Sequence, residues 1–271
     1  MTPAYDGLPL ASYRWASPSG LERGRGVYLV HGLSEYAGRY EHVAAWLNAR
    51  GWDVAAHDHR GHGRSKGRRA ALRRSDDLIV DAEQQIAAYA QTLGAPPVVL
   101  GHSMGGIVAA HVALRGRIDL AGLVLCSPAM RLKINALEQV LLKTLRVIAP
   151  SLPVPNRNAR AQRSHDQAVT DAYAADPLVN RVITARLAAF IADYGPLAVA
   201  GAHELVPRTL MIVAGADSMV DTAGSRAFAD AAPPGRLAMR WHEQAWHEIL
   251  NETPAIAAPA YADLDAWLTE I

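Results

Sequence analysis

Short apolar runs alternate with amphipathic stretches along most of the chain. The runs are rich in β-branched residues, as buried strands are, and the stretches between them repeat apolar residues every three or four positions, as helices do. This alternation predicts an α/β fold built from βαβ units, with a largely parallel sheet flanked by helices. We expect strands at 26–30, 53–57, 98–101, 120–126, 209–213 and 237–241, an antiparallel edge strand at 8–15, and helices at 40–50, 76–93, from 104 onward, 222–231 and about 254–268.

The alternation is interrupted between Ser127 and Pro207. Structureless connections longer than about 15 residues are uncommon in compact domains, so this segment is expected to be an inserted substructure. We predict a core made of residues 1–127 and 207–271, with a helical cap of residues 128–206 inserted into it.

The first half of this insert predicts an unusually apolar helix. Its apolar residues follow one helix face at positions 134, 137, 141, 145 and 148. Val140, Leu142 and Val147 fall off this face, and prolines from Pro150 onward end the helix. A helix that is apolar beyond one face either packs on two neighbours or exposes apolar surface toward a substrate or a lipid. Both interpretations remain open from the sequence.

A lone serine stands between glycines where an apolar strand changes to an alanine-rich helix. Gly101-His102-Ser103-Met104-Gly105 matches G-x-S-x-G, a sharp strand-to-helix turn that exposes a serine hydroxyl. Small neighbours prevent collisions in such a turn, and the helix N-terminus lies behind the hydroxyl. The motif and its context together predict Ser103 as a catalytic nucleophile.

A serine hydroxyl needs a base to take its proton and a carboxylate to orient that base. In an α/β fold with such a serine turn, the histidine that acts as the base should follow the last strand, where both His242 and His247 are present. His247 is favoured because it lies further beyond the strand, where a loop brings it over the serine. Asp217 follows the strand at 209–213 and is favoured as the acid over Asp221, which has an ordinary role near a helix N-terminus.

The oxyanion that forms in such a reaction needs two backbone N–H donors. The amide of Met104, directly after the serine, is expected to be one of them. The amide of Leu33, in the loop after the first core strand, is expected to be the other, with His31 and Gly32 shaping that loop.

Several histidines are candidates for metal ligands, at positions 57, 59, 62, 102 and 111. None is combined with a cysteine or a carboxylate pair at ligand spacing. The serine chemistry itself needs no metal. We therefore expect no metal and no cofactor.

Among its 271 residues the chain has 27 Lys and Arg against 26 Asp and Glu, a net charge of +1 that gives no reason to expect nucleic acid as a partner. One stretch departs from this balance, because Arg60 to Arg74 contains seven cations and no acid. We interpret this stretch as a solvated loop, with contact to an anionic headgroup as the alternative.

Cys126 is the only cysteine and lies in an apolar strand, which excludes an intrachain disulfide and fits a reducing compartment. The N-terminal stretch has no pattern of a secretory signal, and no apolar run is long enough to span a bilayer. These features favour a cytoplasmic location, with peripheral membrane contact through the cap left open.

Six segments match one known family in order and cover nearly the whole chain: HGLSEYAGRY (31–40), AHDHRGHGRSKGRR (56–69), GHSMGG (101–106), DAYAADPLV (171–179), AGAD (214–217) and WHEILNE (246–252). On these segments the chain resembles the monoacylglycerol lipase and lysophospholipase branch of the α/β-hydrolase fold. The resemblance implies a catalytic triad of Ser103, Asp217 and His247. It also implies that the oxyanion donors are Leu33 and Met104 and that the insert is a cap.

The same resemblance implies substrate-binding residues. Glu35 and Arg39 would shape the wall behind the oxyanion loop, and Tyr173 would lie in the cap near the glycerol end of the pocket. Two positions depart from the family. Tyr36 stands where members often have histidine, and Leu250 stands where mammalian monoacylglycerol lipases have a second histidine associated with glycerol recognition.

Together these features predict a serine carboxylic ester hydrolase that works through an acyl-enzyme, with monoacylglycerols or lysophospholipids as leading substrates. The alternatives are a small-ester esterase, an acyltransferase, peptidase or lyase with the same triad, or a non-catalytic binding module. The complete Ser, Asp and His set, with both donor loops, argues against the binding module.

Overall fold

One seven-stranded sheet forms the centre of the computed structural model, which describes residues 1–156 and 162–271. Its strands are β3 (Ser12–Trp15), β4 (Gly26–Val30), β5 (Asp53–His57), β6 (Val98–His102), β7 (Gly122–Cys126), β10 (Thr209–Ala214) and β11 (Leu237–His242). Their order across the sheet is β11-β10-β7-β6-β4-β5-β3, and only the edge strand β3 runs antiparallel to its neighbour. The predicted, largely parallel sheet is confirmed.

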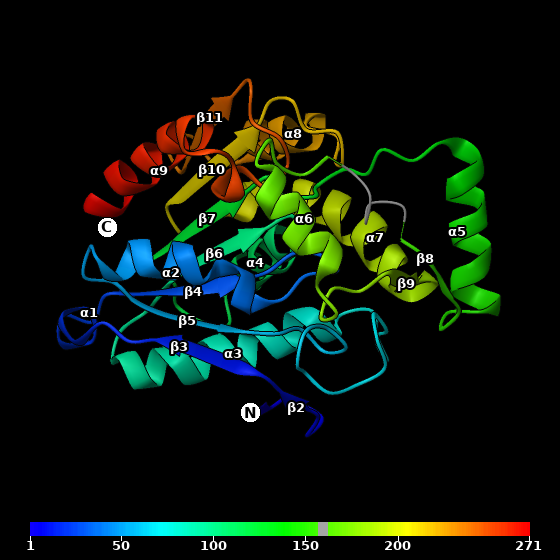
Figure 1. Ribbon diagram of the computed structural model, residues 1–271, viewed down its shortest axis with the longest axis horizontal. Coiled ribbons are helices and arrows are strands. Elements are labelled where there is room, and N and C mark those ends of the chain that lie inside the picture. Colours follow the sequence, from blue (N-terminus) through cyan, green and yellow to red (C-terminus); the bar gives the residue numbers. More distant parts are fainter. Residues whose placement is uncertain (157–161) are drawn as a thin grey trace.

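Helices cover both faces of this sheet (Figure 1). One face packs against α3 (Asp77–Leu93), α4 (Met104–Arg115) and α8 (Ala223–Ala231), and the other against α2 (Glu41–Asn48) and α9 (Pro254–Thr269). Along β4, side chains alternate between the two apolar cores that result. The central strands are buried on both faces, which is why they stand out in the sequence as continuous apolar runs.

The remaining elements are short and lie mostly near the chain ends and loops. They are α1 (Pro18–Glu22), the pair β1 (Thr2–Pro3) and β2 (Pro9–Leu10), and the 3-10 turns η1 (Ala37–Tyr40), η3 (Ala202–Glu204) and η4 (Ile249–Asn251). The edge strand is shorter than predicted. Pro9–Leu10 pairs with Thr2–Pro3 instead of the main sheet, and the amide of Lys66 donates to the carbonyl of Pro9, which ties this segment to a loop.

The insert between β7 and β10 contains three helices and a small strand pair. They are α5 (Ala136–Ile148), α6 (Gln167–Ala175), α7 (Ala185–Gly201), and the antiparallel strands β8 (Pro153–Pro155) and β9 (Val182–Thr184). Helix α7 packs on α4 and α8, and its Leu187 and Phe190 are buried in the core of the sheet. The boundary between core and cap therefore stays a prediction, and residues 157–161 of the predicted cap lie outside the described residues.

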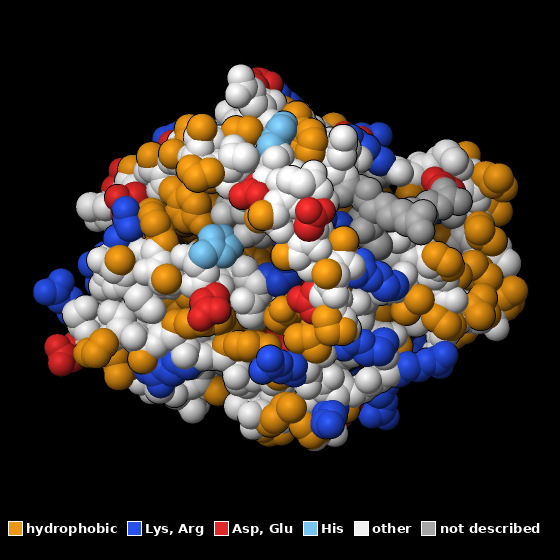
Figure 2. Space-filling model, viewed as in Figure 1, with side chains coloured by type: hydrophobic (Ala, Val, Ile, Leu, Met, Phe, Trp, Pro, Cys, Tyr) orange, Lys and Arg blue, Asp and Glu red, His pale blue; other side chains and the backbone are white. Residues whose placement is uncertain are grey.

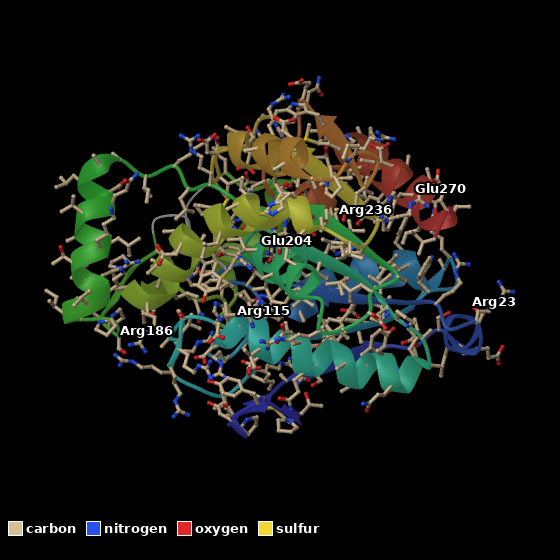
Figure 3. The ribbon with its side chains drawn as sticks, turned by 180° about the vertical axis from the view of Figure 1, so that it is seen from behind. Arg23, Arg115, Arg186, Glu204, Arg236 and Glu270 are labelled. Atoms are coloured by element: carbon tan, nitrogen blue, oxygen red, sulfur yellow. The ribbon has the colours of Figure 1, made fainter. Side chains whose placement is uncertain are left out.

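Helix α5 stands apart at one end of the molecule and contacts α7. Its mixed face, with Gln139, Leu142, Lys143 and Arg146, lines a groove against α7. The outward face is apolar, and Leu137 is 76% exposed. Hydrophobic side chains dominate this end of the molecule in the space-filling view (Figure 2), and α5 stands apart from behind as well (Figure 3).

This orientation bears on the first of the two interpretations of the apolar helix. Ordinary packing of its stripe is wrong, since Leu137, Leu141 and Ile148 of that stripe are exposed, whereas the off-stripe Leu142 is half-buried. The physical reason is that α7 offers α5 a partly charged side, where Arg146 pairs with Asp193 at 2.6 Å.

The cationic stretch after β5 is only partly a solvated loop. Arg60 is buried and pairs with Asp81 at 2.6 Å, so this part of the prediction is wrong. A buried guanidinium requires such a partner, and α3 supplies it. Arg64, Lys66 and Arg68 are exposed, as expected. Cys126 is fully buried, which confirms its place in a core strand.

Candidate active site

Ser103 lies in the turn between β6 and α4 and has a backbone conformation that few residues with a side chain adopt. Its φ is 54° and its ψ is −118°. The neighbouring glycines allow this turn, because a Cβ on Gly101 would lie 2.4 Å from the carbonyl oxygen of Gly105, and a Cβ on Gly105 would lie 2.1 Å from that of Val30. The sharp strand-to-helix turn expected at Ser103 is thus present, and Ser103 lines a pocket.

His247 connects the serine to a carboxylate. Its Nε2 lies 2.9 Å from Oγ of Ser103, and its Nδ1 lies 2.6 Å from Oδ2 of Asp217. The other oxygen of Asp217 accepts hydrogen bonds from the amides of Met219 and Val220, at 2.7 and 3.1 Å. Burial acts to raise the pKa of Asp217, but His247 and the two amides outweigh it and lower the pKa, so the carboxyl group stays ionised.

The two rival residues from the sequence lie away from this chain of hydrogen bonds. Nε2 of His242 lies 3.1 Å from a carboxylate oxygen of Asp263 on α9. Asp221 pairs with Arg131 at 3.0 Å. The structure therefore brings together the three residues that the sequence favoured.

The two predicted oxyanion donors lie beside the serine. Leu33 and Met104 both line the same pocket as Ser103. Within the described residues, neither backbone amide donates a hydrogen bond to another protein group. Both N–H groups are therefore free to bind an oxygen atom in the pocket.

The loop that carries Leu33 is fixed by side chains on both sides of it. Nδ1 of His31 donates to the carbonyl of Gly32 at 2.8 Å, which leaves Nε2 to accept from the amide of His59 at 2.9 Å. Oε1 of Glu35 accepts from the amide of Gly32 at 2.6 Å. The predicted shaping of this loop by its neighbours is consistent with these contacts.

A buried network of charges forms one wall of the pocket. Arg39 donates to Glu35 at 2.7 Å and to Glu248 at 2.7 Å. Arg163, from the insert, donates to Glu248 at 3.0 Å and covers the ring of Tyr173, 3.4 Å from its centroid. Burial acts to raise the pKa of Glu248, but Arg39 and Arg163 outweigh it and hold that pKa well below its usual range, so Glu248 is ionised.

The three predicted substrate-binding residues therefore differ in whether they line the pocket. Glu35 and Tyr173 line the pocket, whereas Arg39 lies behind it and joins Glu35 to Glu248. The sequence reasoning missed Glu248 and Arg163. Glu248 directly follows His247 and could have been noticed for that reason, but nothing in the local sequence marks Arg163.

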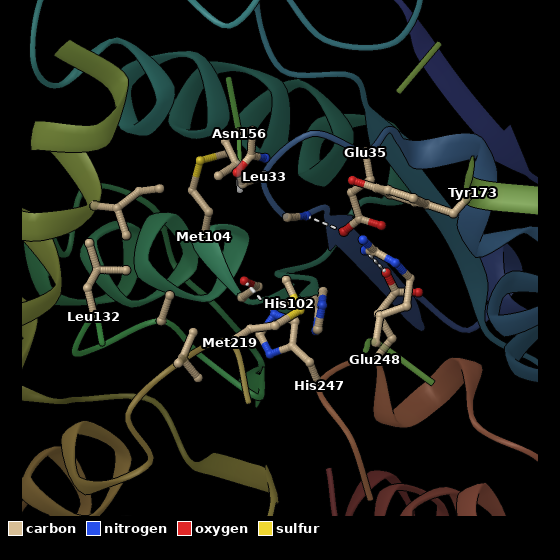
Figure 4. Close-up of a pocket in the computed structure, with 16 residues that line it drawn as sticks. Leu33, Glu35, His102, Met104, Leu132, Asn156, Tyr173, Met219, His247 and Glu248 are labelled. Carbon is tan, nitrogen blue, oxygen red and sulfur yellow. Dashed lines mark hydrogen bonds and ion pairs between the residues drawn. The ribbon is translucent and has the colours of Figure 1, made fainter. Parts of the chain in front are cut away.

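The pocket has two chemically distinct sides. Glu35, Tyr173 and Glu248 lie on one side, and Leu132 and Met104 lie on the other (Figure 4). Ser103 lines the same pocket. Such a site accommodates a molecule with one polar and one apolar end.

The candidate metal histidines have other contacts. His57, His59 and His62 are buried in a cluster with His31, and the nearest rings, of His31 and His59, have centroids 4.3 Å apart. His111 contacts the carbonyl of Tyr194 at 2.8 Å. In the described part of the chain, no group of His, Cys, Asp or Glu side chains has an arrangement that could hold a metal ion.

Comparison with known proteins gives consistent matches over most of the chain. A family model described as "Serine aminopeptidase, S33" matches residues 23–254. The monoacylglycerol lipase of Mycolicibacterium smegmatis is 34% identical over 232 residues, 83% of this chain and 82% of that protein. The crystal structure of Paleococcus ferrophilus monoacylglycerol lipase has a TM-score of 0.84 at 28% identity, covering 96% of this chain and 98% of that one. A soluble variant of Saccharomyces cerevisiae monoglyceride lipase shares the fold, with a TM-score of 0.88 at 20% identity over 100% of this chain and 94% of that one.

The sheet, the strained serine turn and the histidine behind it define a serine hydrolase of the α/β-hydrolase fold. The expected fold class is confirmed. The chain belongs to the family described as serine aminopeptidase S33 and, within it, to the members that resemble monoacylglycerol lipases. It is a carboxylic ester hydrolase.

Proposed function

We propose that Ser103, His247 and Asp217 form the catalytic triad. Oγ of Ser103 attacks the ester carbonyl carbon while Nε2 of His247 takes the hydroxyl proton, and Asp217 stabilises the imidazolium that results. The imidazolium then donates the proton to the departing alcohol, which leaves an acyl-enzyme on Ser103. The observation that carries this proposal is the single imidazole in contact with both other residues, at 2.9 and 2.6 Å.

In the second half of the reaction, His247 takes a proton from a water molecule, whose oxygen attacks the acyl carbon. The free acid leaves, and the proton returns to Ser103. In both halves we propose that the amides of Leu33 and Met104 bind the oxyanion. Preorganised donors of this kind contribute about 3 kcal/mol each to lowering the barrier. Their unpaired state next to Ser103 supports this role.

We propose monoacylglycerols as the substrates. The apolar side of the pocket suits an acyl chain, and the polar side suits the hydroxyl groups of glycerol. In this wall, Arg39 and Arg163 are paired with the carboxylates of Glu35 and Glu248, so these four groups leave no unbalanced cation for a phosphate. This pairing favours an uncharged alcohol over a phosphate-bearing headgroup, in agreement with the names of the Mycolicibacterium smegmatis and Paleococcus ferrophilus monoacylglycerol lipases.

We also propose that α5 rests on a membrane surface from which such lipids are taken. Its outward face exposes Leu137, Val140, Leu141, Val147 and Ile148. An amphipathic helix with an exposed apolar face lies in the plane of a lipid interface. Within the described residues, no helix is long and apolar enough to cross a bilayer.

The test is a comparison of acid release from four substrates: 1-monooleoylglycerol, lysophosphatidylcholine, 4-nitrophenyl butyrate and an aminoacyl 4-nitroanilide. We expect kcat/KM to be highest for monooleoylglycerol and Ser103→Ala to abolish hydrolysis. Higher kcat/KM for the short ester, the phospholipid or the anilide would replace the proposal with a small-ester esterase, a lysophospholipase or a peptidase, respectively. Transfer of the acyl group to an added alcohol in preference to water would indicate an acyltransferase.

A separate pair of variants tests the assignment of His247 as the base. His247→Ala should abolish hydrolysis of 4-nitrophenyl butyrate, whereas His242→Ala should retain it, because His242 contacts Asp263 on α9 instead of the serine. Loss of activity only in His242→Ala would reverse the assignment.

A further inference from the structure

The loop that carries His247 is closed by a buried carboxylate outside the proposed triad. Oε1 of Glu252 accepts a hydrogen bond from the amide of Trp246 at 2.8 Å, and its Oε2 accepts one from the amide of Thr253 at 3.3 Å. Trp246 directly precedes His247. Glu252 therefore holds the two ends of the turn on which the imidazole is mounted.

The same carboxylate binds a segment of the insert. Oε2 of Glu252 accepts from the amide of His165 at 2.8 Å, and Nδ1 of the His165 ring lies 2.8 Å from Oε1. The His165 ring also stacks on Trp246, with the ring centroids 3.8 Å apart. The side chain of Glu252 is inaccessible to solvent, whereas that of His165 is 34% exposed, so these contacts lie at the edge of the protein interior.

Two more hydrogen bonds align this segment with the histidine loop. The amide of Glu248, directly after His247, donates to the carbonyl of Arg163 at 2.8 Å. The hydroxyl of Ser164 donates to the carbonyl of Asn251 at 2.7 Å. Residues 163–165 and Glu252 thus form a clasp around the loop, and we use this name for them below.

The clasp has a consequence for His247 because the imidazole has few other supports. Apart from Ser103, Asp217 and the ring of His102, whose centroid lies 4.8 Å away, its position depends on the backbone at residues 246–248. Removing the carboxylate leaves the amides of Trp246 and His165 without their acceptor, and the loop must move or admit water to satisfy them. A displacement of about 1 Å between reacting groups lowers a rate by about 100-fold.

We propose that Glu252 is a positioning residue for His247 and that, through Glu252, the insert segment 163–165 sets the place of the catalytic base. Assembly of the active site then depends on the docking of the insert as well as on the core. This inference rests on the proposed function, since it assumes that His247 is the base.

The central variant is Glu252→Gln, which keeps the size of the side chain but replaces one acceptor oxygen with a donor. We expect kcat for the soluble substrate 4-nitrophenyl butyrate to fall by about 10- to 100-fold while KM changes by less than about threefold, because geometry is altered and the pocket is not. The matched control is Glu83→Gln, a buried carboxylate that pairs with Arg117 away from the site. It should keep kcat within about twofold.

Thermal unfolding of both variants separates positioning from general destabilisation. A loss of kcat in Glu252→Gln that is absent in Glu83→Gln at equal stability supports the proposal. Wild-type kcat in Glu252→Gln, or equal losses in both variants, overturns it. If Glu252→Gln does not fold, His165→Ala decides the matter, since it keeps the carboxylate and removes only the ring contacts. A loss of kcat of about threefold or more supports the clasp, and unchanged kcat overturns the contribution of the insert.

Measurements on the wild-type enzyme distinguish failure of this inference from failure of the proposed function. If the wild type neither hydrolyses 4-nitrophenyl butyrate nor reacts at Ser103 with a fluorophosphonate, the proposed function fails. If the wild type does both and Glu252→Gln is equally active, only the positioning role fails.

Discussion

His247 has one hydrogen-bond partner on each ring nitrogen, Ser103 on Nε2 and Asp217 on Nδ1. The carboxylate is itself held by the amides of Met219 and Val220. An ionised Asp217 accepts a hydrogen bond from Nδ1–H of His247 and thereby favours the tautomer whose Nε2 is unprotonated and, in the proposed triad, can take the serine proton. The same charge favours the imidazolium that forms during the reaction.

This arrangement predicts a large effect of a change that removes the charge and keeps the shape. Asp217→Asn should lower kcat by about 10⁴-fold, because the amide favours the wrong tautomer of His247. The measurement is steady-state hydrolysis of 4-nitrophenyl butyrate. Asp221→Asn is the control, since Asp221 pairs with Arg131 instead of His247. An Asp217→Asn enzyme within tenfold of the wild type would contradict the proposed role.

Among the elements, α5 has an unusual orientation because its apolar face points away from the protein. The helix begins with a capping box in which the Asn135 side chain accepts from the Glu138 amide and the Glu138 side chain accepts from the Asn135 amide. Local hydrogen bonds and the Arg146–Asp193 pair thus fix the helix without burying its apolar residues. An exposed apolar surface of this kind indicates an interaction site.

The proposed contact of α5 with membranes predicts a separation of binding from catalysis. Changing Leu137, Leu141 and Ile148 together to serine should lower binding to phosphatidylcholine vesicles containing phosphatidylglycerol by at least about tenfold. Hydrolysis of soluble 4-nitrophenyl butyrate should stay within about twofold of the wild type. Vesicle cosedimentation measures the first quantity.

The control for this experiment changes apolar residues that are equally exposed on other elements. Leu197 on α7 and Val206 are 55% and 70% exposed. Their replacement by serine should leave vesicle binding unchanged. Equal losses in both variants would show that α5 has no special role in membrane binding.

At the scale of the whole molecule, a cluster of buried histidines lies between the sheet and the loops next to the site. Burial lowers the pKa of His31, His57 and His59 well below the usual value and lowers that of His62 to about 4. In the unfolded chain these groups titrate near about 6.5. Because the unfolded state binds more protons below that pH, their contribution to stability is complete above about pH 6.5 and is lost as the pH falls toward 4.

We therefore expect the free energy of unfolding to decrease steadily between pH 6.5 and 4.5, with a slope of about 1.4 kcal/mol per pH unit for each proton taken up. Urea unfolding at a series of pH values measures this slope. His62→Asn retains a donor toward the carbonyl of Arg60 and removes one titrating group. It should therefore reduce the slope by about 1.4 kcal/mol per pH unit, the contribution of one proton. His203→Gln is the exposed control and should not alter it. A flat profile above pH 4.5 would refute this account.

Much of the fold and the site could be predicted from the sequence because the signals are local. The strands are buried on both faces, so they read as apolar runs, and the elbow at Ser103 is marked by its own glycines. Asp217 and His247 follow strands in the expected chain order. Each of these signals depends on residues within a few positions of one another.

The tertiary structure alone decided how distant segments meet. Three contacts join parts of the chain that are far apart: Arg39 pairs with Glu248, Arg163 covers the ring of Tyr173, and the clasp forms at Glu252. The outward orientation of the apolar face of α5 also depends on packing between distant segments. Contacts of this kind leave no periodic or local pattern in a single sequence, because they depend on how whole helices and strands pack against one another. The chain order therefore determined which residues are candidates for the reaction, and the packing of the insert on the core decided what surrounds them.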